Sequence, residues 1–194
     1  MLDVFHTYIR SRITISDEEL KSIDAACTLK KLRKKQYLLQ EGDVWQYNAF
    51  VAKGCVRTYR VDERGGEHVI QFSVENWWTG DRESLLTGKP SRCNIDAIED
   101  SEIILIKKHD FDMLCKTIPA LNEMVNMILQ RSFNTAQNRI HASISLSAEE
   151  KYRDFIEKYP GLVNRVPQGM IASYLGISPE TLSRVRNQMS RNDR

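Results

Sequence analysis

Three charged side chains near the C-terminus have the types and spacing needed to contact DNA bases. Glu180 and Arg184 are four residues apart, which places them on one face of a helix, and Arg186 follows two positions later. An arginine can donate two hydrogen bonds to guanine, and a glutamate can accept one from the amino group of cytosine. The predicted DNA-contacting residues are Ser178, Pro179, Glu180, Thr181, Arg184, Arg186 and Gln188.

The residues around these side chains predict two short helices joined by a tight turn. Gly176 stands where the first helix must end in a left-handed residue. Ser178 can cap the second helix, and Pro179 suits its first position. The apolar residues available for a shared core are Ile171, Leu175, Ile177, Leu182 and Val185. We therefore predict a helix-turn-helix over residues 168–189, with positive charge added by Arg165, Arg191 and Arg194. A helical hairpin used only for packing is the alternative.

A long helix is predicted before this motif. From Pro119 onward, apolar residues recur at steps of three and four without Gly or Pro, as far as Ile144. An ordinary core-packing helix is one interpretation, but the length of the pattern favours a helix along which two chains pair. The predicted dimer-interface residues are Leu121, Val125, Ile128, Leu129, Phe133, Ala136 and Ile140.

Between Tyr37 and Lys108 the sequence is typical of a β-roll. Short apolar runs alternate with turn signals, which indicates many short strands. The predicted strands are Tyr37–Leu39, Ala49–Val51, Val56–Val61, His68–Phe72, Asn94–Ile98 and Ile103–Ile106. Residues 64–66, Arg-Gly-Gly, predict a hairpin turn because glycine tolerates positive φ. Before the roll, Ser16 and Glu19 form a capping-box pattern that starts a helix, and residues 30–35 are interpreted as a solvated helix end.

The predicted fold class is therefore α+β, in three parts. Residues 1–118 form a sensor β-roll with an N-terminal helix, residues 119–146 a dimerisation helix, and residues 147–194 the helix-turn-helix domain. A second capping box, Ser147 with Glu150, starts another helix that ends near Tyr159. The junction at Ser145–Ser147 is a candidate hinge.

Composition excludes several other classes. Of 194 residues, 41% are hydrophobic and 28% charged, with a formal net charge of +2, as in an ordinary cytoplasmic globular protein. No apolar run approaches the roughly 18 residues of a membrane span, so we expect no membrane partner. The cysteines Cys27, Cys55, Cys93 and Cys115 are widely spaced, which indicates buried thiols rather than a disulfide framework or a metal site.

Catalysis is not expected. A cupin-like enzyme shares the β-roll, but it needs closely placed histidines with a carboxylate around a metal. His6, His68, His109 and His141 lie far apart, and only His68 belongs to a predicted strand. We find no nucleophile elbow or phosphate-binding glycine loop. A cupin-like enzyme remains the remote alternative.

The order of these parts resembles the Crp/Fnr family of transcription regulators. Three segments carry the resemblance: Tyr37-Leu-Leu-Gln-Glu-Gly-Asp43, Ala49-Phe-Val-Ala-Lys-Gly-Cys-Val-Arg57, and Gly176-Ile-Ser-Pro-Glu-Thr-Leu-Ser-Arg184. The resemblance implies a cyclic-nucleotide-binding-like jelly roll and a homodimer that binds double-stranded DNA. It makes Glu180 and Arg184 the base-contacting residues and RNA polymerase a candidate partner.

The same resemblance outlines an effector pocket that departs from the family pattern. Its candidate residues are Trp78, Gly80, Asp81, Ser91, Arg92, Ala136 and Gln137. Asp81 replaces a ribose-binding glutamate, and Ser91 occupies the place of a phosphate-binding arginine unless one extra loop residue brings Arg92 there. Ala136 cannot hydrogen-bond a nucleobase. A cyclic nucleotide is thus a disfavoured cofactor, and no cofactor is assigned.

Two further departures concern the ends of the chain. It stops at Arg194, before the family's usual hairpin wing, so we expect fewer phosphate contacts. The grouped N-terminal cysteines of oxygen-sensing members are absent. We expect a DNA-binding regulator whose roll biases the hinge. A cyclic-nucleotide or small-ligand sensor acting through protein contacts is the alternative.

Overall fold

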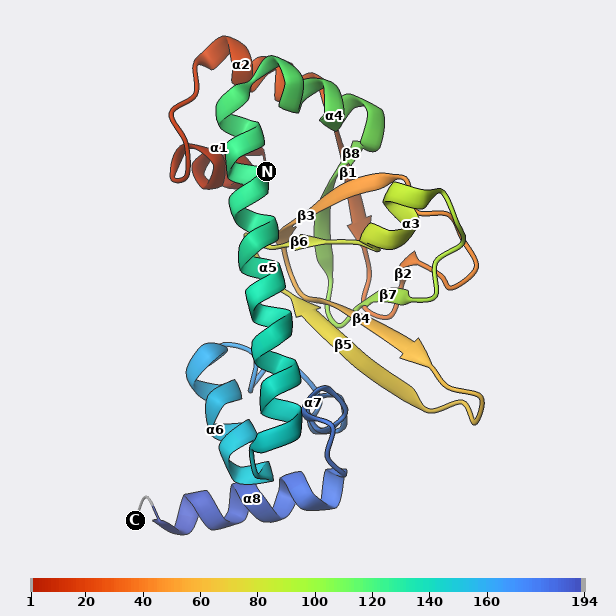
Figure 1. Cartoon of the computed structure of the whole chain (residues 1–194), viewed down its shortest axis with the longest axis vertical. Coiled ribbons are helices and arrows are strands. Elements are labelled where there is room, and N and C mark those ends of the chain that lie inside the picture. The colour runs from red at the N-terminus through yellow and green to blue at the C-terminus, as the bar shows by residue number, and fades with distance from the viewer. Residues whose placement is uncertain (1, 193–194) are drawn as a thin grey trace. The chain divides into compact units, whose positions relative to one another are not determined.

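The computed structural model describes residues 2–192, with side chains described as far as residue 190 (Figure 1). The chain divides into two compact units. Unit 1 comprises Met1–Val61 and Ile70–Leu129, and unit 2 comprises Asp62–Val69 and Gln130–Arg194. The division falls inside the long helix α5 (Pro119–Ser145) and at the tip of the hairpin formed by β4 (Val56–Val61) and β5 (Glu67–Ser73). The domain bounds expected from the sequence stay predictions.

Unit 1 is built on two four-stranded sheets, with strand orders β1-β8-β3-β6 and β2-β7-β4-β5. Besides β4 and β5, the strands are β1 (Cys27–Leu32), β2 (Tyr37–Leu39), β3 (Tyr47–Lys53), β6 (Trp78–Thr79), β7 (Asn94–Ala97) and β8 (Ser101–Lys107). The short helix α3 (Arg82–Thr87) lies between β6 and β7. The predicted β-roll is confirmed, and the strands predicted at residues 37–39 and 56–61 have the predicted bounds.

The sheet containing β3 is the middle layer of unit 1. Successive side chains of a strand point to opposite faces, and the fully buried Ala49 and Val51 join the core cluster between the two sheets. Phe50 joins a second cluster, formed with the helices on the other face. Strand β8 alternates in the same way, so both faces of this sheet are buried.

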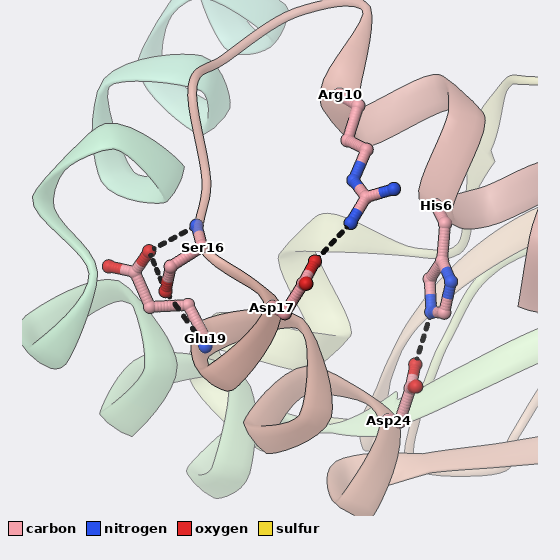
Figure 2. Close-up of polar contacts among 6 residues, drawn as sticks. All are labelled: His6, Arg10, Ser16, Asp17, Glu19 and Asp24. Atoms are coloured by element: carbon pink, nitrogen blue, oxygen red, sulfur yellow. Dashed lines mark hydrogen bonds and ion pairs between the residues drawn. The ribbon is translucent and has the colours of Figure 1, made fainter.

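The helical layer consists of α1 (Leu2–Arg10), α2 (Asp17–Ala26), α4 (Lys108–Thr117) and the start of α5. Figure 2 shows the polar contacts that hold α1 to α2, an ion pair between Arg10 and Asp17 and a 2.6 Å contact between His6 Nε2 and Asp24 Oδ1. The predicted capping box is confirmed, because Ser16 Oγ accepts from Glu19 N and the Glu19 carboxylate accepts from Ser16 N.

The interpretation of residues 30–35 as a helix end was wrong. Residues up to Leu32 belong to β1, which pairs with β8 over its full length. Leu32 is buried in the core between the sheets, whereas Lys31 is exposed. Pairing with β8 therefore places these residues in a strand, although the residues just before them form the helix α2.

The two ends of α5 differ in burial. Leu121 and Met124 are 2% and 1% exposed and belong to the core of unit 1, and Val125 and Ile128 pack partly against it. The prediction of Leu121 as a dimer-interface residue was therefore wrong, because its side chain is already used within one chain.

The apolar stripe beyond Leu129 has no such cover within the described chain. Phe133, Ile140 and Ile144 are 62%, 61% and 80% exposed, and Ala136 is also exposed. This stripe is the part of the predicted interface that one chain leaves available.

Unit 2 combines the hairpin tip and the later part of α5 with α6 (Ala148–Lys158), α7 (Gln168–Leu175) and α8 (Pro179–Asn192). The predicted hairpin turn is confirmed, since Gly65 has a φ of +80° and Asp62 Oδ1 accepts from the backbone N–H of Arg64 and Gly66. The predicted start of α6 is also confirmed by the reciprocal bonds between Ser147 and Glu150.

The cysteines are thiols within the packed structure. Cys55 and Cys93 are buried, whereas Cys27 and Cys115 are half-buried. Burial raises the pKa of the Cys27 thiol to about 12, and it also raises the pKa of Cys115. Both groups therefore stay protonated near neutral pH, which makes them poor nucleophiles.

Candidate nucleic-acid interface

A left-handed glycine ends the first helix of the predicted motif. Gly176 has a φ of +66°, and its N–H bonds the carbonyl of Ser173 at 3.1 Å. The next N–H, of Ile177, bonds the carbonyl of Ala172 at 3.1 Å. These bonds satisfy carbonyls that a helix C-terminus would leave unpaired, so the chain can turn sharply.

The second helix begins immediately after this turn. Ser178 Oγ accepts from the backbone N–H of Thr181 at 3.2 Å and contacts the Thr181 hydroxyl at 3.1 Å. Pro179 is the first residue of α8, where a missing N–H costs little. The predicted cap is confirmed, and α7, the turn and α8 form a helix-turn-helix.

A small apolar core fixes how α8 is rotated. It contains Ile171 and Ala172 from α7, Leu182 and Val185 from α8, and Tyr152 and Phe155 from α6, all buried. Leu182 is fully buried, so the face of α8 opposite to it must be turned to solvent.

The outward face of α8 presents a continuous row of polar groups. Its shallow surface is lined by Pro179, Glu180, Ser183, Arg184, Asn187 and Gln188. Four predicted DNA-contacting residues meet there, together with two that the sequence reasoning missed. Ser183 and Asn187 lie three residues from Glu180 and Arg184 respectively, so the helical period could have identified them.

Other predicted contacts lie off this row. Thr181 and Arg186, both predicted to contact DNA, are half-buried and do not belong to the exposed row. Thr181 turns its hydroxyl to Ser178, which is itself engaged as the helix cap. The side chain of Arg191 and all of Arg194 lie outside the described residues, and Arg165 is half-buried.

The row combines opposite charges with neutral amides. Hydrogen bonds from the backbone N–H of Glu180 and from Ser178 lower the pKa of the Glu180 carboxyl. Glu180 is therefore an anionic acceptor near neutral pH, while Arg184 supplies a planar donor one turn further along. Such a surface can donate to guanine and accept from cytosine or adenine amino groups.

The predicted effector residues are only partly brought together. Trp78 packs on the helical side of the middle sheet, with ring centroids 5.5 Å from those of Phe50 and Phe111. Its indole N–H bonds the Tyr8 hydroxyl at 3.3 Å. The prediction that Trp78 lines an effector pocket was wrong, because β-strand alternation turns it away from the space between the sheets.

Asp81 and Ser91 do meet, but they bond to each other. The Ser91 hydroxyl donates to Asp81 Oδ2 at 2.7 Å, and Asp81 Oδ1 accepts from Ser84 N at the start of α3. Ser91 Oγ also accepts from the backbone N–H of Cys93. Both side chains are thus engaged in holding the loop from Gly80 to Cys93.

The other effector candidates differ in burial and in the unit to which they belong. Gly80 has a φ of +138°, and a Cβ there would come within 2.5 Å of Trp45 Nε1, so only glycine suits the position. Arg92 is exposed. Ala136 and Gln137 belong to unit 2 and are exposed on α5.

Residues 2–192 contain neither a candidate metal site nor a helix that could span a membrane. No group of three or more His, Cys, Asp and Glu side chains in this range could hold a metal ion. None of the helices in this range is long and apolar enough to cross a membrane.

Comparison with known proteins places the chain among regulators. Residues 29–118 match the model of the cyclic nucleotide-binding domain. Regulatory protein HlyX of Actinobacillus pleuropneumoniae is 27% identical over 190 residues, covering 89% of this chain and 76% of that protein. The fumarate and nitrate reduction regulatory protein of Vibrio cholerae is 25% identical over 194 residues, covering 93% and 76%.

Solved structures share the fold. FixK2 from Bradyrhizobium japonicum aligns with a TM-score of 0.76 at 19% identity, covering 86% of both chains. The catabolite activator protein of Thermus thermophilus aligns with a TM-score of 0.57 at 22% identity, covering 92% of this chain and 85% of that one. The β-roll, the long helix and the C-terminal helices therefore form an architecture found in these proteins.

Proposed function

Since this chain belongs to the Crp/Fnr family of regulators, we propose that it is a homodimeric transcription regulator that binds double-stranded DNA sequence-specifically. In this role the chain has no catalytic activity and acts in the cytoplasm. RNA polymerase is the further protein partner that this role implies.

The observation that carries the proposal is the outward row of α8. Glu180, Ser183, Arg184 and Asn187 follow one another at helical spacing on a helix whose opposite side is buried. A recognition helix presents such a row to base edges in the major groove. Glu180 and Arg184 are proposed to specify bases.

Pairing of two chains would follow the exposed stripe of α5. Large apolar side chains such as Phe133 and Ile140 are seldom left in contact with water along a helix face, and burying them against a second copy is favourable. Together with Val125, Ile128, Leu129 and Ala136, they form the proposed interface. The two recognition helices would then contact half-sites about 34 Å apart.

The β-roll is proposed to act as a sensor whose effector is not cyclic AMP. The mutual hydrogen bond of Asp81 and Ser91 supports this, because a cyclic nucleotide needs partners for its ribose and for its phosphate charge. A change in the roll would bias the segment around Ser147, between α5 and α6, and with it the population of DNA-competent dimers.

The test is selection of binding sites by the full chain from a pool of random duplex DNA. The expected result is enrichment of a two-fold-related sequence, with half-sites about one helical turn apart. Binding should weaken steeply with salt, because phosphate contacts release counterions.

Absence of any enriched sequence would contradict the proposal. Weak salt dependence of the residual binding would instead favour a sensor module that acts through protein contacts. Enrichment that is equal for wild type and Arg184→Ala would retain DNA binding but remove Arg184 from the base-contacting residues.

A further inference from the structure

Unit 2 contains a hollow beside the first helix of the helix-turn-helix. Its volume is about 320 Å³, at the lower end of the range for small-molecule sites. Residues of α5 and α6 form two sides, and the last turn of α7 with the adjoining Gly176 forms a third. Val69, from the hairpin tip, completes the lining.

One wall of the hollow is aromatic. The ring of Phe155 lies 5.5 Å from that of Tyr159 and 5.6 Å from that of Tyr174, measured between centroids. Burial raises the pKa of the Tyr174 hydroxyl, which therefore remains a protonated hydrogen-bond donor. Such a wall offers a flat ligand a large apolar contact with an adjoining polar edge.

Cationic side chains also line the hollow. Arg139, Lys151 and Lys158 line the hollow, against the single carboxylate of Asp154. Lys158 pairs with Asp154 at 2.7 Å, whereas Lys151 Nζ donates to the Ser143 carbonyl, a neutral acceptor, at 3.2 Å. The Arg139 guanidinium lies 4.1 Å from the centre of the Tyr174 ring. The lining therefore carries an excess of positive charge, which attracts anions.

We propose that this hollow binds a small aromatic carboxylate. The ring of the ligand lies against the half-buried Tyr159 and Tyr174, which the buried Phe155 supports from behind, and its carboxylate faces Lys151 and Arg139. A charge-assisted hydrogen bond from Lys151 to the ligand replaces its weaker bond to the Ser143 carbonyl.

The position of the site gives the ligand access to the DNA-binding motif. Four consecutive lining residues, 173–176, form the end of α7 and the turn before α8. A bound ligand therefore touches the segment that sets the angle between these helices. Binding itself depends on unit 2 alone and is independent of the proposed DNA binding.

The experiment is a calorimetric titration of the full chain with 1-naphthoate, a two-ring aromatic carboxylate. Saturable binding at one site per chain is expected. Lys151→Gln and Arg139→Gln should each weaken it about tenfold or more, as expected for loss of a charge-assisted bond. The neutral 1-naphthamide should bind far more weakly than the acid.

Arg153→Gln is the matched control, because Arg153 is on α6 but pairs with Glu149 and does not line the hollow. It should leave the affinity unchanged. Nuclear magnetic resonance of the bound chain should show shifts of the backbone amides of residues 173–176. Lys151 is half-buried and bonds only a carbonyl, so Lys151→Gln tests the site even where Arg139→Gln unfolds the unit.

Three results would overturn the proposal. The first is the absence of saturable heat at millimolar 1-naphthoate. The second is equal affinity for the amide and the acid. The third is an equal loss of affinity in Arg153→Gln and Lys151→Gln, which would indicate general attraction to positive charge.

Discussion

The hydroxyl of Ser173 accepts a hydrogen bond from the backbone N–H of Val69 at 2.9 Å, and it donates to the carbonyl of Glu67, also at 2.9 Å. Strand β5 lies at the edge of its sheet. An N–H and a C=O two residues apart are the groups that a further strand would pair at such an edge. One side chain of α7 thus takes the place of a strand within unit 2.

Ser173→Ala should release the Val69 amide. Val69 is buried, and an unsatisfied buried N–H costs roughly 1–3 kcal/mol, so unit 2 should become less stable by about this amount. Hydrogen–deuterium exchange should show faster exchange at Val69. Ser22→Ala is the control, because Ser22 is exposed and donates only to a carbonyl of its own helix. Unchanged exchange at Val69 would mean that the hydrogen bond between Val69 and Ser173 does not stabilise this end of the β4–β5 hairpin.

Arg184→Ala should weaken binding to the selected DNA site by roughly 1–3 kcal/mol and relax the preference for one base pair. The reason is loss of a two-bond contact to guanine. Fluorescence anisotropy with the selected site and with single-base variants measures both effects. Arg153→Ala removes the same charge from α6 and serves as control. An equal loss on all sequences would make Arg184 a phosphate contact instead.

Ile140→Asp should prevent pairing along α5. Ile140 is 61% exposed in one chain, so the substitution leaves the monomer's core intact but places a charge in the proposed interface. Sedimentation equilibrium should show a dimer for the wild type and a monomer for the variant. Arg131→Asp introduces the same side chain about two and a half turns away, on the opposite side of the helix, and should remain dimeric. A dimeric Ile140→Asp would refute this interface.

Asp96→Asn should destabilise unit 1 strongly. Arg57 donates from Nε to Asp96 Oδ1 at 2.8 Å and from Nη2 to Asp96 Oδ2 at 3.0 Å, and both residues are buried. Removing one partner of such a pair costs about 3–5 kcal/mol, because the other charge stays buried. Chemical unfolding followed by tryptophan fluorescence measures the loss, since all three tryptophans lie in unit 1. Asp112→Asn, which breaks an exposed pair with Lys108 in the same unit, should cost about 0–1 kcal/mol.

Cyclic AMP should give no saturable heat in a calorimetric titration of the full chain. The partners that the nucleotide would need are satisfied within the loop, because Ser91 donates to Asp81 and Asp81 caps α3. Ser91→Ala should not create binding, because it adds no positive charge. Saturable binding by the wild type would instead mean that the exposed Arg92 reaches the phosphate and that this hydrogen bond opens.

Features set by a few neighbouring residues could be predicted from the sequence. The capping boxes at Ser16 and Ser147 and the left-handed Gly176 form where local hydrogen bonding requires them. The strand pattern also followed from local alternation and turns. These signals depend on residues within one or two turns of each other, which a single sequence contains completely.

Features that depend on residues far apart in the sequence could not be predicted. Residues 27–32 form a strand only because β8 lies beside them. The direction of Trp78 depends on the register of β6 against β3, and the burial of Leu121 depends on a core assembled from helices far apart in the sequence. On α8, the rotation fixed by Leu182 separates Arg184 from Arg186, although both are arginines beside the same turn.

The exposed stripe of Phe133, Ile140 and Ile144 has a consequence for gene dosage. If the DNA-competent form requires two chains, its concentration rises with the square of the chain concentration while monomers predominate. Doubling expression would then raise the active form about fourfold, by mass action alone. Promoters under this protein would respond to small changes in its synthesis more sharply than to a regulator that acts as a monomer.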